Sequence, residues 1–246
     1  DNNEIYSTIS FIPKNPSFAA YVKGWTATGY SFGKFMMNTY IIVFPKVVGI
    51  VISTIITAYG FSRFQFVGKT FLFAVLMSTL FLPQVVLNIP QFLMFTDLGW
   101  VDTYKPLIVP SFFANEPYFV FMLVQFMINH VFLFIFRILT GFQAICNSVQ
   151  RLIYIVVPIV KPSIVSVALF QFMWSSNDFQ GPLIYINTVT KYPASLGLRL
   201  IADSETGFEW NKILALSVIS IIPTLIVFFL AQDQFIDGIA AGGVKG

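Results

Sequence analysis

The residues with the greatest chemical potential are few and far apart. The chain has one histidine, His130, and one cysteine, Cys146. A zinc site needs several such ligands close together, so we expect both to be packing or loop residues and predict no metal site. A Ser/His/Asp triad would have to use His130, which lies in an apolar run without a nearby acid. The sequence therefore predicts no catalytic residues.

Two further patterns invite a chemical interpretation. Gly68-Lys69-Thr70 matches the end of a phosphate-binding loop, but the first glycine of that loop falls at Arg63, after an apolar stretch rather than a strand. Nucleotide binding by this segment is excluded. Glu116 and Asp178 are acids close to apolar segments, where ionisable groups are often functional. A proton relay is one interpretation, but without paired intramembrane acids an ion-coupled transporter is poorly supported.

Composition places these residues in a membrane protein. Of 246 residues, 57% are hydrophobic and 10% are charged, against about 25% charged in an average soluble domain. The mean hydropathy is +0.79. A soluble enzyme this apolar would expose too much hydrophobic surface to water. The formal net charge of +3 is too small to indicate a nucleic-acid partner.

Five apolar stretches have about the length that a helix needs to cross a bilayer. They cover residues 36–61, 70–96, 106–136, 153–177 and 213–232. Helices satisfy every backbone group internally, so the predicted fold class is all-α, a polytopic helical membrane protein. Pro45, Pro83, Pro90 and Pro223 fall in or near these stretches and predict kinks.

The stretches divide the chain into one transmembrane domain, residues 1–246. Residues 1–35 are predicted to be an external segment, 36–232 to hold the spans and loops, and 233–246 to be a tail. The chain opens on Asp1-Asn2-Asn3-Glu4 without a starting Met, which favours a fragment whose N-terminus is missing over a processed mature protein. Lys and Arg are nearly balanced between the two sides, so they do not decide the orientation.

Several segments together resemble the permease family of binding-protein-dependent ATP-binding cassette (ABC) sugar importers, in particular the maltose-permease-like half with a glycine-rich tail. The matching segments are residues 63–69, 82–91, 115–119, 174–185, Lys191-Tyr192-Pro193 and 241–246. The resemblance covers nearly the whole chain. It implies a six-helix permease fold, of which five spans are present and the first helix is missing, with residue 1 outside and residues 233–246 in the cytoplasm.

The resemblance also implies the function. The chain would be the permease subunit of an ATP-driven carbohydrate importer in the bacterial inner membrane, forming part of the sugar path and coupling to ATPase subunits. Its partners would be a second permease subunit, two ATP-binding subunits that hold the ATP, an extracellular sugar-binding protein, membrane lipid and a di- or oligosaccharide. The chain itself would need no cofactor and would not be an enzyme. The alternatives are a membrane-embedded transferase-type enzyme, against which the lone histidine and sparse acids count, or an ion-coupled secondary transporter.

Three groups of site residues follow from the matching motifs. The predicted ATPase-coupling loop contains Cys146, Asn147, Arg151, Ile155, Pro158, Lys161 and Pro162. The predicted ATPase-contacting tail contains Gly242, Gly243, Val244, Lys245 and Gly246, the alternative being a disordered terminus. The predicted external loop, residues 178–212, and sugar path contain Trp174, Asn177, Asp178, Gly181, Pro182, Tyr192 and Pro193.

The first half of the coupling loop departs from the family. Its Glu-Ala-Ala signature falls on Leu139, Thr140 and Gly141, and its glycine on Ile145. Residues 128–145 are apolar on all sides apart from Arg137, which predicts a segment that buries itself and lengthens the third span toward Phe136. Either the loop has diverged or the segment is read in a shifted frame. The matching flanks favour the shifted frame.

Overall fold

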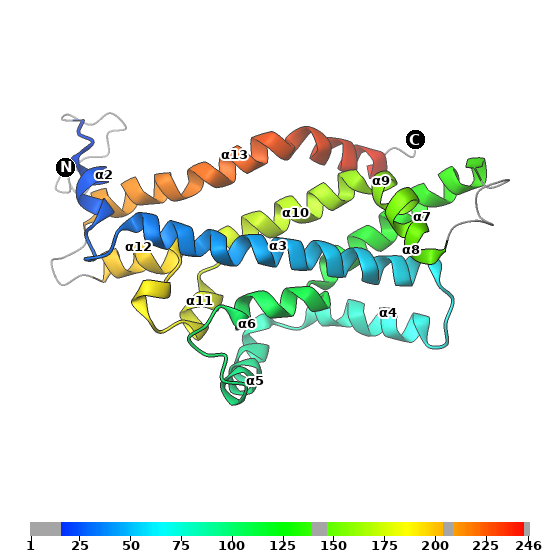
Figure 1. Cartoon of the computed structure of the whole chain (residues 1–246), viewed down its shortest axis with the longest axis horizontal. Helices are drawn as coiled ribbons and strands as arrows, with labels where there is room; N and C mark the ends of the chain where they lie inside the picture. Colours follow the sequence, from blue (N-terminus) through cyan, green and yellow to red (C-terminus); the bar gives the residue numbers. More distant parts are fainter. Residues whose placement is uncertain (1–15, 139–146, 204–208, 244–246) are drawn as a thin grey trace.

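Every regular element in the described part of the chain is a helix. The computed structural model describes residues 16–138, 147–203 and 209–243 (Figure 1). The helices, in chain order, are α2 (Ala19–Trp25), α3 (Phe32–Arg63), α4 (Lys69–Ser78), η1 (Thr79–Phe81), α5 (Gln84–Asp97), α6 (Lys105–Ile108), η2 (Val109–Phe113), α7 (Pro117–Ile138), α8 (Ser148–Arg151), η3 (Leu152–Val156), α9 (Val157–Ile159), α10 (Lys161–Ser176), α11 (Gln180–Tyr185), η4 (Val189–Lys191), α12 (Ala194–Ala202) and α13 (Trp210–Gly243).

The helices supply up to five membrane-spanning segments. Three are long and apolar enough to cross a bilayer: Phe32–Arg63, Lys105–Ile128 and Trp210–Gln234. Two more arise if each bent pair is one span: Lys69–Phe81 with Gln84–Asp97, bent by 103°, and Ser148–Ile159 with Lys161–Ser176, bent by 79°. The predicted fold class, an all-helical polytopic membrane protein, is confirmed.

The breaks lie inside three stretches that were predicted to be continuous. Leu82 is extended before Pro83, which cannot continue the hydrogen-bond ladder of η1. Val160 interrupts the fourth stretch just before Pro162, which suits the first turn of α10. In the third stretch, Ala114 takes a positive φ of 51° between η2 and α7. Hydropathy alone shows none of these interruptions, because the residues on both sides are equally apolar.

Helix α3 is the central element. One face of α3 packs through Ile50 and Ala58 against Leu123 and Met127 of α7 and Val167 of α10, all of which are buried. Gly49 lets η2 approach, since a Cβ there would lie 2.8 Å from the Phe112 ring. These contacts bring α3, η2, α7 and α10 together in one bundle.

The segment after α10 is folded rather than extended. The predicted external loop, residues 178–212, contains α11, η4 and α12. Helix α12 packs on the first turns of α3 and on α13, with Phe35, Ile201 and Leu216 buried at the contact. A Cβ on Gly197 would lie 2.4 Å from the Phe35 ring, so the absence of a side chain allows this approach. Residues 178–212 are longer and more polar than the other connectors. One face of α12 within them is nevertheless apolar and is buried against α3 and α13.

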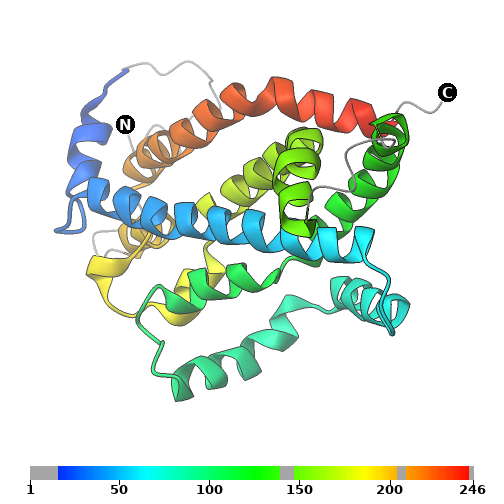
Figure 2. The same ribbon diagram turned by 45° about the vertical axis from the view of Figure 1, so that its right-hand side comes forward.

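The bundle has two distinct ends (Figures 1 and 2). We call one the α12 end, which carries α2, α12 and the loops 98–104 and 186–193. The other is the α8 end, which carries α8, the loop 64–68 and the last turns of α7 and α13. The first described helix and the end of α13 therefore lie at opposite ends, as the five-span interpretation requires. Helix α13 continues to Gly243, through most of the predicted tail, because Asp233 and Asp237 end the apolar stretch but not the helix.

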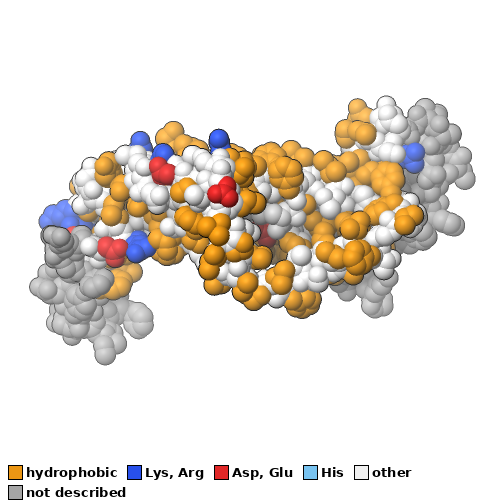
Figure 3. Space-filling view, turned by 90° about the horizontal axis from the view of Figure 1, so that it is seen from below, with side chains coloured by type: hydrophobic (Ala, Val, Ile, Leu, Met, Phe, Trp, Pro, Cys, Tyr) orange, Lys and Arg blue, Asp and Glu red, His pale blue; other side chains and the backbone are white. Residues whose placement is uncertain are grey.

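Helices α4 and α5 form an arm that stands away from the bundle. Within these two helices, which are fully described, α4 has no buried residue and α5 has only Phe95. Figure 3 shows the molecule from below relative to Figure 1. Hydrophobic side chains are numerous on this lower face, and most of the visible charged side chains lie toward the α12 end. The space between the arm and the bundle holds the site described next.

Candidate functional site

A cavity of about 1180 Å³ lies between the α4–α5 arm and the bundle. Its walls come from α3, α4, α5, α6, η2, α11, the break before α7 and the turn after α10. Two of the three interruptions, at Leu82 and at Ala114, thus meet at this cavity. Irregular backbone at membrane depth is tolerated where it lines a cavity or is buried in protein.

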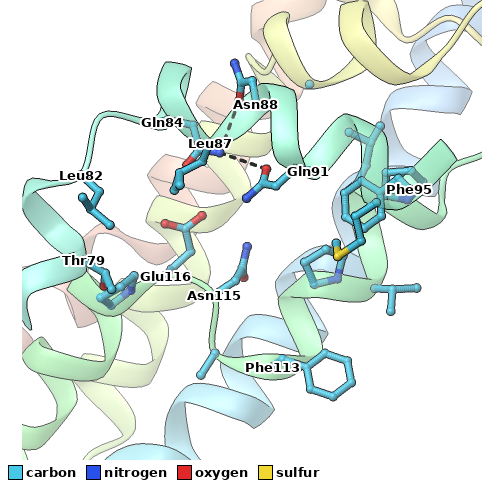
Figure 4. A pocket seen from close by; sticks show the side chains of 18 of the residues that line it. Thr79, Leu82, Gln84, Leu87, Asn88, Gln91, Phe95, Phe113, Asn115 and Glu116 are labelled. Carbon is cyan, nitrogen blue, oxygen red and sulfur yellow. Dashed lines mark hydrogen bonds between the residues drawn. The ribbon is translucent and has the colours of Figure 1, made fainter. Parts of the chain in front are cut away.

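One wall carries a row of amides. Gln84, Asn88 and Gln91 are spaced by four and three residues, which places them on one face of α5. The Gln84 Nε2 donates hydrogen bonds to Asn88 Oδ1 at 3.5 Å and to Gln91 Oε1 at 3.3 Å. Asn115 and Glu116, from the break before α7, face this row across the cavity (Figure 4). The cavity therefore has groups that both donate and accept hydrogen bonds.

Three charged residues reach the cavity from three different elements. Lys46 of α3 pairs with Asp178 after α10, at 3.6 Å between Nζ and Oδ2, with side chains that are 15% and 27% exposed. Asp178 Oδ1 also accepts a hydrogen bond from the Gly181 backbone at 3.0 Å. The Glu116 carboxylate makes no hydrogen bond or ion pair with any residue in the described ranges. The cavity thus contains a neutralised pair and one further carboxylate.

An aromatic wall lies toward the α12 end. Phe95 stacks on Trp100 with ring centroids 5.5 Å apart, and Tyr185 meets Phe95 edge-on at 5.4 Å. All three residues line the cavity. Apolar ring faces beside amides and a carboxylate suit a ligand that is polar at its rim and apolar on its face.

Asp102 ties two loops together at the α12 end. Its Oδ1 accepts hydrogen bonds from the backbone of Asn187 at 3.0 Å and Thr188 at 2.9 Å. Its Oδ2 accepts from the Thr188 hydroxyl at 2.6 Å and from Lys191 Nζ at 2.8 Å. The hydrogen bond from Lys191, followed by those from Thr188, holds the pKa of this carboxyl well below its usual range. The clamp stays charged, and its contribution to stability is lost only when the pH falls below the pKa of an unfolded aspartate, about 4.

Replacing Asp102 with alanine should loosen this clamp. Asp102 has a φ of 59°, a left-handed conformation that asparagine adopts more readily than alanine. We expect Asp102→Ala to cost about 1–2 kcal/mol and to raise hydrogen exchange across residues 186–192. Asp102→Asn, which keeps the conformation and one acceptor, should show a smaller rise. Equal exchange in the wild type and both variants would show that the loop is held by other contacts.

The α8 end carries a small exposed tip, which we define as residues 147–154. Asn147 and Gln150 form a reciprocal capping box, with hydrogen bonds of 3.0 and 2.9 Å. The Tyr59 hydroxyl of α3 donates to the Ser148 carbonyl at 3.1 Å. Val149, Ile153 and Tyr154 are 63%, 53% and 74% exposed. The tip is thus locally ordered, anchored to α3 and apolar on its outer side.

The predicted coupling residues are contiguous in space. Asn147 caps α8, Arg151 ends it, Ile155 and Pro158 follow in η3 and α9, and Lys161 and Pro162 open α10. Cys146 lies outside the described residues. The predicted tail residues Gly242 and Gly243 are the last of α13, while Val244, Lys245 and Gly246 lie outside the described residues. Helix α7 runs to Ile138, whereas the apolar span that includes it ends at Ile128, so the lengthening of the third span toward Phe136 stays a prediction.

The predicted path residues divide into three groups. Asp178 and Gly181 line the cavity, and Asn177 and Pro182 are their neighbours in the chain. Trp174 instead stacks on Phe119 at 5.1 Å, and Tyr192 and Pro193 belong to the α12 end. Neither the pairing of Lys46 with Asp178 nor the amide row was predicted from the sequence. The helical spacing of Gln84, Asn88 and Gln91 in an uncharged apolar stretch was the available signal.

Known proteins resemble the chain over most of its length. No protein-family profile matches. The permease protein AraQ of an arabinooligosaccharide transport system from Halalkalibacterium halodurans is 27% identical over 97% of this chain and 83% of its own. The inner membrane ABC transporter permease protein YcjP of Escherichia coli is 25% identical over 96% and 83%. The sn-glycerol-3-phosphate permease protein UgpE of Brucella abortus is 27% identical over 86% and 73%.

A chain in a solved transporter structure has a similar fold. A bacterial ABC transporter that imports the acidic polysaccharide alginate contains a chain that superposes with a TM-score of 0.77, covering 95% of this chain and 85% of that one at 21% identity. The curated relatives are transport subunits rather than enzymes, in agreement with the sequence-based prediction. The chain is therefore similar over most of its length to multi-pass membrane permease subunits of ABC transport systems, and it shares their helical fold.

Proposed function

We propose that the chain is one of two different permease subunits of a complete importer. Two ATP-binding subunits would dock at the α8 end, which then faces the cytoplasm. An external sugar-binding protein would deliver a di- or oligosaccharide at the α12 end. The sugar would pass through the cavity between the α4–α5 arm and the bundle, with the second permease subunit closing its open side.

The exposed tip is the observation that carries this proposal. A subunit moved by ATP hydrolysis elsewhere must offer the ATPase a surface that is both apolar and rigid. Val149, Ile153 and Tyr154 provide the apolar surface, and the capping box keeps it folded. The hydrogen bond from Tyr59 ties the tip to α3, so a displacement of the tip would be passed to the bundle.

Two other features are consistent with this arrangement. The end of α13 lies at the same end as the tip (Figure 1), so Gly242 and Gly243 would be close to the same ATPase subunits. Without side chains, these glycines would allow a close backbone approach. At the opposite end, the Asp102 clamp would give the sugar-binding protein an ordered platform rather than a flexible loop.

Site-directed cross-linking tests the docking surface. In a Cys146→Ser background, Val149→Cys should cross-link to a cysteine in the ATPase subunit of the assembled transporter. The matched control is Val22→Cys, because Val22 is also an exposed valine but lies in α2 at the α12 end. Cross-linking from Val22 but not from Val149, or sugar-stimulated ATP hydrolysis without any contact at Val149, would reject the proposed docking.

A further inference from the structure

We infer that the cavity is a binding site for an uncharged sugar chain, and that Glu116 is the specificity-determining residue that disfavours anionic sugars. This inference rests on the proposed function, and it adds a chemical class to the transported ligand. It concerns a site within this subunit, distinct from any site on the external sugar-binding protein.

The charge balance of the cavity is the first argument. Lys46 is the only cation among the lining residues, all of which lie in the described ranges, and it is already paired with Asp178. Glu116 forms no hydrogen bond or ion pair in those ranges, and its carboxylate points toward the amide row (Figure 4). Lys46 also acts on it electrostatically, so this single cation faces two carboxylates and the three groups together carry a net negative charge. A carboxylate or phosphate on a ligand would meet this charge without a free cation to offset it. Such repulsion is stronger in a partly buried site than in water.

The hydrogen-bonding groups are the second argument. Sugar hydroxyls both donate and accept, and Gln84, Asn88, Gln91 and Asn115 do the same. Glu116 can only accept when ionised, so it matches a hydroxyl and opposes an anion. The stacked rings of Phe95 and Trp100 offer apolar faces for the C–H side of a sugar ring.

The size of the cavity is the third argument. Its volume of about 1180 Å³ exceeds the range of about 300–1,000 Å³ typical of small-molecule pockets. A single small anion such as a phosphate ester would leave most of this space unfilled. The relatives include systems named for a neutral sugar chain and for a phosphate ester. The cavity of this chain matches the neutral class.

Direct binding to the permease pair isolates this site from the external binding protein. The chain is purified with its second permease subunit in lipid nanodiscs. The affinities for arabinotriose, which is neutral, and trigalacturonate, which carries three carboxylates, are then measured by equilibrium dialysis. We expect the neutral trisaccharide to bind at least tenfold more tightly. In Glu116→Gln this ratio should fall to about threefold or less, because the repelling charge is removed.

Matched variants separate charge from folding. Asp97→Asn removes the same charge from an exposed position outside the cavity and should leave the ratio unchanged. Glu116→Asp keeps the charge and should retain the preference for arabinotriose. With the unmodified chain, raising the salt from about 0.05 to 0.5 M should shrink the ratio, since salt screens the repulsion. This last measurement does not depend on any variant folding correctly.

Three results would overturn the inference. They are equal or tighter binding of trigalacturonate by the unmodified pair, an unchanged ratio in Glu116→Gln, and no binding of either trisaccharide. Each leaves the docking of the ATPase at Val149 untouched, because that contact is measured separately by cross-linking. Failure of the cross-link with a normal affinity ratio would instead reject the coupling proposal alone.

Discussion

Replacing Tyr154 with aspartate is expected to reduce sugar-stimulated ATP hydrolysis by the assembled transporter at least tenfold. Tyr154 is the most exposed of the three apolar residues of the tip. If it enters a cleft on the ATPase subunit, it becomes a buried aromatic anchor, and such residues contribute about 2 kcal/mol or more to an interface. An aspartate in the same place would bury a charge without a partner.

The same substitution should leave the permease itself intact. Tyr154 is exposed and its hydroxyl makes no hydrogen bond with any described residue, so its loss removes no internal support. Tyr154→Phe keeps the apolar ring and should retain most of the activity. Phe18→Asp introduces the same charge at an equally exposed aromatic position near the α12 end and serves as the control. Full stimulated hydrolysis by Tyr154→Asp would show that the tip is not the coupling surface.

Replacing Lys46 with methionine is expected to destabilise the subunit by about 3 kcal/mol, the lower part of the range for removing one partner of a buried ion pair. The lower part applies because Lys46 and Asp178 remain 15% and 27% exposed. The change leaves Asp178 without its cation and adds a second uncompensated carboxylate beside Glu116. The midpoint of thermal unfolding of the purified permease pair should fall accordingly.

A double-variant cycle distinguishes the ion pair from the loss of a long side chain. Lys46→Met with Asp178→Asn should be more stable than the sum of the two single effects predicts, because no charge is then left unpaired. The coupling expected for two residues in contact is about 0.5–3 kcal/mol. Strict additivity of the two single variants would mean that the pair contributes nothing beyond its separate side chains.

The sequence predicts the membrane-spanning segments well and their interruptions poorly. Apolar length determines where a chain can cross a bilayer, so α3 and α13 were found close to their observed bounds. The break at Ala114 depends on a single positive φ, which the apolar composition around it does not indicate. Pro83 predicts a kink, but its type alone does not give a bend as large as the observed 103° between Lys69–Phe81 and Gln84–Asp97.

For the candidate site, the sequence likewise indicates the individual residues but not their contacts. Each of Lys46, Glu116 and Asp178 is visible in the sequence as a charge in or beside an apolar stretch. Their convergence is not, because it requires α3, the break before α7 and the turn after α10 to meet at one place. The Asp102 clamp is likewise hidden, since its partners lie 85 or more residues away along the chain. The amide row was predictable from its helical spacing alone.

Helix α3 has a mechanical consequence. Its 32 residues make a rod about 48 Å long, well beyond the bilayer core of about 30 Å. Near one end Tyr59 holds the tip, and near the other Asn38 donates to the carbonyls of Thr190 and Tyr192 at 2.9 Å. Although Pro45 lies between these two points, the helix is unbroken from Phe32 to Arg63. Lys46, which lines the cavity, belongs to the same helix, so one element connects the tip, the cavity and the α12 end.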